Sequence, residues 1–392
     1  MSVQWDPFSW EAQHDPYPIY RRLRDERPVY RNAELDFWAL SRHADVLKAH
    51  LDPATFLSSH GVTLDGIEMG LPDGPLIVKD PPEHTVHRKI VSRVFTPRRI
   101  AELEPTIRDL ASRLLDELVP RGGFDVVSEF ATLLPLGIIS NLLGLPVEYR
   151  DRIVELSDRM IHRGSGGDGE VTPDAASARE EMRTILQEVV EHRRRHPAED
   201  IVTMMIRAEI PDGAEVKHLS DIDIASKFLE LVFAGHETVA SLIPSAVVAL
   251  NWYPEQRRRL ASDPGMWPKA VEEMLRWDPP SRYQGRWTSR DVNLHGQIIP
   301  ANSRVLLVTG SATHDEREYE QPEIFDIHRK IDTPVTFGRG VHHCIGHALA
   351  RLEIRVAFEE LLARIPDYAL TSDVERKICG NNRALAKLPI TF

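Results

Sequence analysis

Apolar and polar positions along the chain alternate mostly with a helical period. Helical spacing covers 16–27, 102–118, 131–143, 147–162, 174–195 and the stretch from 345 onward. The most apolar stretch, 222–250, is long enough for a membrane span, but Lys227, Glu230 and other polar residues interrupt it. The pattern therefore predicts a buried central helix surrounded by amphipathic helices.

Short strands are expected in a smaller part of the chain. Two apolar stretches, 29–30 and 37–40, bracket residues 32–36 in the manner of a hairpin, and Ser41 is then predicted to cap a helix that ends near Leu51. Beyond two consecutive prolines the pattern predicts strands at 284–288, 292–294, 297–299 and 305–308. The expected fold class is mainly α with a smaller β region.

Composition narrows the class of protein. The 392 residues are 42% hydrophobic and 28% charged, as in ordinary soluble domains. The length would allow two domains, but no linker, repeat or low-complexity tract divides the sequence, so residues 1–392 are interpreted as a single domain. The net charge of −12 argues against general nucleic-acid binding.

The compartment follows from the cysteines and the N-terminus. Two cysteines argue against a disulfide scaffold and suit a reducing cytosol. The first 18 residues are polar and rich in proline, with neither the apolar core of a signal peptide nor a membrane anchor. We therefore expect a cytoplasmic protein.

One of the two cysteines, Cys344, lies at the start of a predicted helix within 337–353 (FGRGVHHCIGHALARLE). A thiolate at a helix N-terminus accepts otherwise unpaired backbone N–H groups and is stabilised by the helix dipole. Gly340 and Gly346 flank the cysteine and allow the backbone to approach a flat, bulky group.

Two other interpretations of Cys344 remain open from these residues alone. A free cysteine is often simply a buried structural residue. A zinc site with His342, His343 and His347 is the other alternative, although the usual CxxC spacing is missing.

The predicted central helix contains an unusual pentapeptide, 234–238 (AGHET). Glycine within a helix is less favourable than alanine by about 1 kcal/mol. A buried acid and a buried hydroxyl, Glu237 and Thr238, are also unfavourable unless they are hydrogen-bonded. Several unfavourable residues at one place in a helix indicate a functional site.

A basic segment precedes the middle of the chain. His84 and Arg88 are four residues apart in a predicted helix and so share one face, and an arginine fork suits carboxylates. The stretch 86–100 contains no acid and has further basic residues at His87, Lys89, Arg93, Arg98 and Arg99.

Together these segments resemble the cytochrome P450 family of haem-thiolate monooxygenases, over nearly the whole chain. The family pattern FxxGxxxCxG matches Phe337, Gly340, Cys344 and Gly346. The pattern [AG]-G-x-[DE]-T matches Ala234, Gly235, Glu237 and Thr238, and HxxxR matches His84 and Arg88. An ExxR pair at Glu273 and Arg276, with Arg329 further on, matches the family's structural triad.

The resemblance implies a bound haem b (heme b, iron protoporphyrin IX) and a role for each matched residue. Cys344 would be the axial metal ligand, within a loop formed by Phe337, Gly340 and Gly346. The haem propionates would be held by His84, Arg88, Arg286 and His342. Ala234 and Gly235 would let O₂ and haem approach the backbone, while the catalytic pair Glu237 and Thr238 would deliver protons.

The resemblance also implies which regions contact substrate. The distal pocket would be lined by Ile67, Met69, Leu71, Ser281, Tyr283, Gln284 and residues 380–382. The glycine-rich stretch 163–171 joins two predicted helices, which suits either the hinge of a lid or a disordered surface loop, and the resembled family has a mobile helix pair here. Ala384 stands where the family often has glycine, which leaves the local backbone there in doubt.

The activity implied is insertion of one oxygen atom from O₂ into a small, largely apolar organic substrate. Since no GxGxxG motif follows a predicted strand, electrons would come from a separate ferredoxin and its reductase, docking on the basic stretch 86–100. The alternatives are a haem-thiolate peroxygenase or isomerase and a non-catalytic haem binder. Retention of Glu237 and Thr238 disfavours both.

Overall fold

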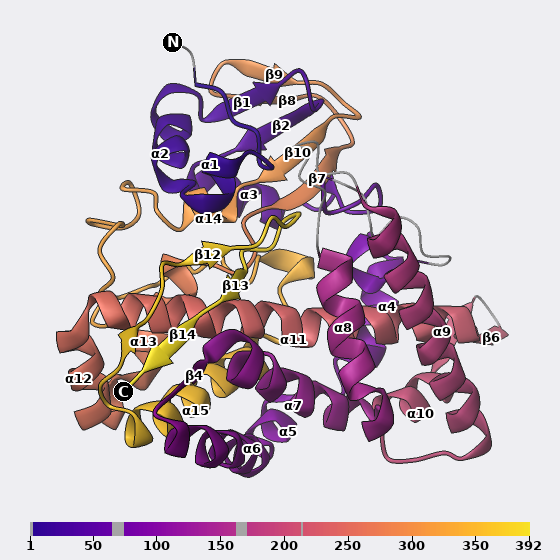
Figure 1. Cartoon of the computed structure of the whole chain (residues 1–392). Coiled ribbons are helices and arrows are strands. Elements are labelled where there is room, and N and C mark those ends of the chain that lie inside the picture. Colours follow the sequence, from indigo (N-terminus) through magenta and orange to yellow (C-terminus); the bar gives the residue numbers. More distant parts are fainter. Residues whose placement is uncertain (1–2, 65–73, 162–170, 213–214) are drawn as a thin grey trace.

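A computed structural model describes residues 3–64, 74–161, 171–212 and 215–392. Figure 1 shows most of the helices in the lower part of the molecule and the larger sheet at the top, together with α1, α2, α3 and α14. The α-helices are α1 Trp10–His14, α2 Tyr17–Glu26, α3 His43–Leu51, α4 Glu83–Val91, α5 Pro97–Ala101, α6 Glu104–Leu118, α7 Leu133–Leu143, α8 Arg150–Ile161, α9 Pro173–Arg195, α10 Ile201–Ile206, α11 Asp221–Trp252, α12 Pro254–Ser262, α13 Trp267–Trp277, α14 Thr309–Ala312 and α15 His347–Arg364. The short 3₁₀ helices are η2 Leu76–Val78, η3 Val119–Arg121, η5 Val147–Tyr149, η6 Pro264–Met266 and η7 Gly340–His342, and η4 Val127–Ala131 is a π-helix.

The strands form one larger sheet and several small ones. The larger sheet has the order β1 (Val29–Asn32), β2 (Phe37–Leu40), β10 (Arg304–Leu307), β7 (Gln284–Thr288), β3 (Phe56–Leu57), with only the β2–β10 pair parallel. The small sheets pair β11 (Ala369–Leu370) and β4 (Gly123–Asp125) with β14 (Pro389–Thr391), β12 (Glu375–Arg376) with β13 (Leu385–Lys387), β5 (Glu209–Asp212) with β6 (Glu215–His218), and β8 (Val292–Leu294) with β9 (Gln297–Ile299). The predicted fold class, mainly α with a smaller β region, is confirmed.

Local chemistry explains where the predicted hairpin turns. The Asn32 side-chain oxygen accepts the backbone N–H groups of Glu34 (3.0 Å) and Leu35 (2.9 Å), and Asp36 adopts a left-handed φ of 51°. Both features are typical of Asn and Asp in tight turns. The predicted strands on either side are confirmed in register, with Val29 opposite Leu40.

The predicted cap at Ser41 is wrong. Helix α3 begins at His43, and its N-cap is Arg42, which makes no side-chain capping bond. The Ser41 hydroxyl instead donates to the Pro28 carbonyl. The His43 N–H donates to Asp315 Oδ2 at 2.8 Å, so a distant carboxylate satisfies the start of this helix.

Helix α11 is the predicted central helix. Ser220 caps it by accepting the Asp223 N–H at 3.0 Å. Among the described helices α11 alone is long and apolar enough to cross a membrane, and 67% of that apolar window is buried inside the protein. Burial of this kind is typical of the core helix of a globular fold.

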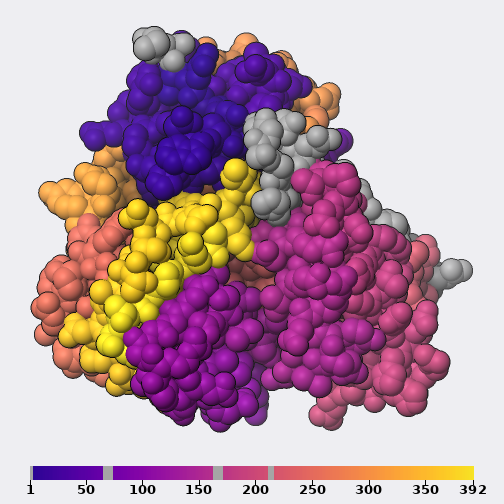
Figure 2. Space-filling model, in the orientation of Figure 1, coloured from indigo at the N-terminus to yellow at the C-terminus, as the bar shows by residue number. Residues whose placement is uncertain are grey.

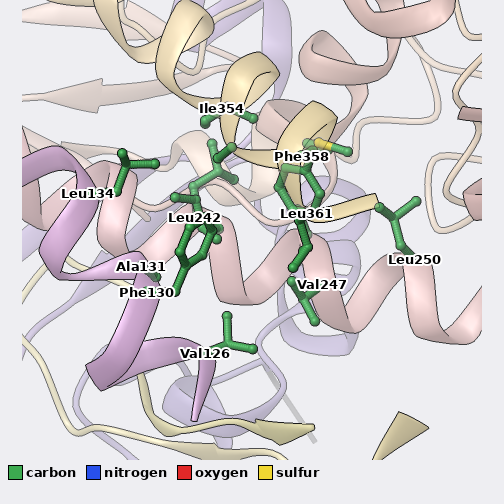
Figure 3. Packing of buried hydrophobic residues seen from close by; sticks show 14 of the residues in the cluster. Val126, Phe130, Ala131, Leu134, Leu242, Val247, Leu250, Ile354, Phe358 and Leu361 are labelled. Carbon is green, nitrogen blue, oxygen red and sulfur yellow. The ribbon is translucent and has the colours of Figure 1, made fainter. Parts of the chain in front are cut away.

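The main core forms where α11 meets α6, α7, α13 and α15. Phe130, Leu242 and Phe358 are buried at its centre (Figure 3). Because α15 begins just after the Cys344 loop and α11 carries the 234–238 segment, their packing fixes two candidate site segments relative to each other. The C-terminal strands lie between the N-terminal region and helices α6 and α7 (Figure 2).

The predicted structural triad supports the approach to the Cys344 loop. Arg276 and Arg329 place their Nε atoms 2.7 Å and 3.2 Å from Glu273 Oε2. Arg276 also donates to the carbonyls of Thr313 (2.9 Å) and Pro322 (2.7 Å). The buried charges are thus paired and hydrogen-bonded, as stability requires, and they tie α13 to the segment that leads into the cysteine loop.

Candidate active site

The loop before Cys344 depends on glycine. Gly338 and Gly340 have left-handed φ values of 62° and 70°. A Cβ atom on Gly340 would lie 2.5 Å from the His50 carbonyl oxygen of α3, closer than packed atoms allow. The Cys344 N–H closes the loop by donating to the Phe337 carbonyl at 2.9 Å. These contacts give a physical reason for Gly340 of the FxxGxxxCxG pattern, whereas a Cβ on Gly346 would meet nothing within 4 Å.

The Cys344 thiol lies just before α15, which begins at His347 and not at Ile345 as predicted. Burial raises the pKa of the thiol, while the backbone N–H groups of Gly346 and His347 act in the opposite direction, together with the charges of Arg88 and Arg351. A bound metal ion would take the proton's place on sulfur. The Arg351 guanidinium also stacks 4.5 Å from the centre of the Phe337 ring.

The segment 234–238 of α11 faces the same cavity as Cys344. The Thr238 hydroxyl donates to the Ala234 carbonyl at 3.2 Å. The structure adds a packing reason for Gly235, because a Cβ atom there would lie 2.6 Å from Ile139 of α7. Glycine at this position therefore lets α7 pack closely against α11 beside the cavity.

Glu237 and Thr238 both line the cavity but differ in their surroundings. Glu237 is 9% exposed, and its Oε1 lies 3.1 Å from Nε2 of the buried His236. The His236 ring is fixed from its other side, with Nδ1 2.7 Å from the Val232 carbonyl. The Glu237 carboxyl group therefore lies beside a buried imidazole, whereas the Thr238 hydroxyl is hydrogen-bonded within α11.

A cavity of about 410 Å³ separates the Cys344 loop from α11. Apolar side chains from several elements line it: Leu76, Ile139, Met160, Ile161, Leu229 and Phe233. Ser281, Gln284 and residues 380–382 reach it as predicted. Tyr283 does not, because it is fully buried in the core near the N-terminus, with Trp5 and Tyr20. The prediction for Tyr283 is wrong, because its side chain packs into this core cluster.

Some predicted substrate-contacting residues lie outside the described residues. These are Ile67, Met69, Leu71 and all of the glycine-rich hinge except Val171.

One end of the cavity gathers hydrogen-bond donors. Arg88 and His84 of α4, Arg286 of β7 and His342 all line it. The His84 and His342 rings lie 4.2 Å apart, and burial lowers their pKa values to about 4 and about 3, with nearby arginines acting in the same direction. Both imidazoles are therefore neutral at physiological pH, each with one N–H to donate.

These donors lack carboxylate partners within the described residues. Neither ring nitrogen of His84 has a hydrogen-bond partner there. The nearby acid, Asp80, already accepts the N–H groups of Ser58 (2.8 Å) and Ser59 (3.1 Å). A buried polar group without a partner is destabilising by about 1–3 kcal/mol. At one end of the cavity lie two arginines, the unpaired imidazole of His84 and the His342 ring, which contacts the Ser58 hydroxyl at 3.2 Å. Together with the cysteine at the face of the cavity, these groups fit a metal group that carries carboxylates.

Glu230 is a cavity residue that the sequence did not single out. Its carboxylate accepts the N–H groups of Leu76 (2.6 Å) and Ile77 (2.9 Å) and so anchors η2 to α11. Burial raises the pKa of this carboxyl to about 7, and the two backbone N–H groups act in the opposite direction. Its position one helical turn before Ala234 was the only sequence signal, because the partner segment is far away in the chain.

The basic stretch 86–100 is only partly a surface. Lys89, Arg93, Arg98 and Arg99 are exposed, and Arg98 pairs with Glu102 at 3.0 Å. His87 is buried, so its predicted place in a docking face is wrong. Helix α5, which carries the two consecutive arginines, packs against α15, and this places them on the side of the molecule where α15 leaves the cysteine loop.

The zinc alternative finds no support in the described part of the chain. There, no three His, Cys, Asp or Glu side chains converge as they would around one metal ion. The cysteine loop is therefore better matched to a single axial sulfur ligand.

Comparison with known proteins gives a consistent result. The family model described as Cytochrome P450 matches residues 266–366, a range that holds the ExxR pair and Cys344. Cytochrome P450 123 of Mycobacterium tuberculosis is 39% identical over 391 residues, 98% of this chain and 96% of that protein. The vitamin D(3) 25-hydroxylase of Pseudonocardia autotrophica is 35% identical, covering 99% of this chain and 96% of its own length. The solved structure of Mycobacterium marinum cytochrome P450 CYP268A2 in complex with pseudoionone superposes with a TM-score of 0.91 at 30% identity, over 100% of this chain and 99% of that one.

Proposed function

The chain belongs to the cytochrome P450 family of haem b monooxygenases, and on that basis we propose that it oxidises a small, largely apolar organic molecule. One oxygen atom of O₂ enters the substrate, and a separate ferredoxin and its reductase supply the electrons. The chain acts as one monooxygenase domain, residues 1–392, in the cytoplasm. The observation that carries the proposal is a single cavity with Cys344 on one side and Glu237 and Thr238 on the other.

The residues of this chain have separate tasks in that cavity. When bound, the haem supplies the iron-centred oxidation chemistry that amino acids lack. Cys344 holds its metal, and His84, Arg88, Arg286 and His342 hold its carboxylates. Phe337, Gly340 and Gly346 shape the cysteine loop. Ala234 and Gly235 have small side chains, so the backbone of α11 lies close to the cavity. Thr238 Oγ1 holds a proton on the side of the cavity where the substrate binds. The Glu237 carboxyl then supplies the next proton to this position.

The lining of the cavity favours an apolar substrate. Its walls on the α11 side are mainly aliphatic and aromatic, and such walls bind ligands by burying apolar area. The vitamin D(3) and pseudoionone named with two relatives are both mostly hydrocarbon, which supports the same substrate class here. The peroxygenase, isomerase and passive haem-binding alternatives would not need the proton pair of α11.

A substrate panel followed by isotope labelling tests this proposal. Soret shifts with terpenoids, fatty acids, steroids and aromatic acids identify compounds that bind beside the haem. Turnover of a binding compound under ¹⁸O₂, with reductant, ferredoxin and reductase, is expected to give product with one labelled oxygen. A rearranged product without label, or the same product yield from peroxide without reductant, would favour the alternatives.

The redox partner is expected to dock near the exposed basic residues Arg98 and Arg99. Charge reversal of both residues to Glu should slow reduction by an acidic ferredoxin roughly tenfold at low salt, because attraction between unlike charges raises association rates. The wild-type reduction rate should also fall as salt increases. Stopped-flow reduction of the carbon monoxide complex measures both effects.

A matched control uses Arg21 and Arg27, which are equally exposed but lie on and beside α2, at the opposite end of the molecule (Figure 1). Their reversal to Glu changes the net charge by the same amount and should leave the reduction rate near the wild-type value. Equal rates for the two double variants, or a salt-independent wild-type rate, would remove the docking assignment.

A further inference from the structure

His50, one residue before the end of α3, is a buried histidine whose ring nitrogens lack hydrogen-bond partners among the described residues. It is 5% exposed. Helix α3 is amphipathic, and a leucine or phenylalanine would pack at such a position without leaving polar atoms unpaired. The imidazole therefore requires a partner that the described residues do not supply.

The ring of His50 lies at the end of the cavity where the other donors gather. It lines the same cavity as His84, Arg286 and His342, and it is next to the cysteine loop, with Cε1 3.5 Å from the place a Cβ on Gly338 would occupy. Its electrostatic neighbours are Arg286 and His342. Among the described residues, the only charged group that shifts its pKa is Arg286, which is positive.

The chemical state of His50 decides what it can bind. Burial, helped by the charge of Arg286, lowers the pKa of its imidazole to about 3, so the ring is neutral at physiological pH. A neutral imidazole has one N–H to donate and one nitrogen to accept. With positively charged and donor groups around it, the missing partner is an acceptor that carries negative charge.

His84 provides an internal comparison. It has the same orphaned ring, lies at the same end of the cavity, and matches the haem-binding HxxxR pattern. His50 belongs to no matched pattern, because α3 lies far upstream of every segment on which the family resemblance rests.

We propose that His50 donates a hydrogen bond from its ring to a haem propionate and so positions the cofactor from α3. Its backbone carbonyl already lies close against the cysteine loop at Gly340, so α3 would touch both the cysteine loop and the carboxylate edge of the haem. The inference rests on haem b binding and does not depend on the substrate or the redox partner.

Haem retention in the holoprotein tests the inference. His50→Leu is expected to lose haem to excess apomyoglobin about fivefold to tenfold faster than wild type, because a hydrogen bond to a charged group is lost. In resonance Raman spectra of the same variant, the propionate bending mode should shift. The red-shifted Soret band of the carbon monoxide complex should remain, since Cys344 is untouched.

Two further variants separate hydrogen bonding from packing. His50→Gln keeps an N–H donor and should restore most of the haem retention, whereas His50→Phe fills the space without a donor and should resemble His50→Leu. His60→Leu removes an exposed imidazole that packs 5.3 Å from the Trp287 ring, and it should behave as wild type. His50 would only pack if His50→Phe lost haem at the wild-type rate with an unshifted propionate mode. In that case His84→Leu should still lose haem faster than wild type. Equal haem loss from the Gln and Phe variants would also overturn the hydrogen bond.

Discussion

Cys344→His should abolish the strongly red-shifted Soret band that the reduced wild-type protein shows under carbon monoxide. That band depends on a thiolate opposite the carbon monoxide, and imidazole donates less electron density to the metal. Burial raises the pKa of the wild-type thiol, while the N–H groups of Gly346 and His347 at the start of α15 favour a negatively charged sulfur. Product formation should fall with the band, because the push of electron density from sulfur is lost.

The second cysteine provides the control. Cys379 is fully buried, and it is not among the residues that line the cavity. Cys379→Ala should therefore keep the red-shifted band even if stability decreases. A wild-type band at the position of a histidine-ligated haem, or a red-shifted band that survives in Cys344→His, would show that Cys344 is not the axial ligand.

Thr238→Ala should separate consumption of reductant from formation of product. The variant loses one hydroxyl, whose bond to the Ala234 carbonyl lies within its own helix, so folding and substrate binding should be retained. Without the hydroxyl, protons are no longer delivered to the right position. The fraction of reductant recovered in product should fall roughly tenfold or more, with peroxide released instead.

Two variants of the same helix complete this test. Thr238→Ser keeps the hydroxyl and should stay well coupled. Ser241→Ala removes a hydroxyl of the same kind, which donates to the Glu237 carbonyl at 2.8 Å but is not among the cavity-lining residues, and it should also couple normally. One assay that measures reductant consumed, peroxide released and product formed gives the coupling of each variant. Tight coupling in Thr238→Ala would make the proton-delivery assignment wrong.

The basic stretch 86–100 illustrates how tertiary packing decides which residues of a sequence pattern reach the surface. The stretch 86–100 reads as a uniform basic run, yet α4 turns His87 inward while Lys89 and Arg93 stay at the surface. Helical periodicity predicts that some positions face inward. Which face is buried depends on the helices that happen to pack against α4.

The sequence by itself determined the features that depend on neighbouring residues. These are the helical period of α11, the hairpin of β1 and β2 with its Asn and Asp turn, and the spacing that places Thr238 one turn after Ala234. Cys344, the proposed metal ligand, was visible in the sequence because its loop glycines and helix start lie within a few residues of it. Each of these depends on local backbone geometry, which a short stretch of chain specifies by its side chains alone.

Only the tertiary structure decided which distant groups meet. The anchoring of η2 by Glu230, the burial of Tyr283 away from the cavity, and the approach of His50 to the cysteine loop join segments far apart in the chain. A pattern of apolar and polar residues indicates that a side chain needs a partner, but it does not identify the partner. The partner depends on how all the elements that share the core pack together. The unpaired ring nitrogens of His50 became informative only when their surroundings among the described residues were known.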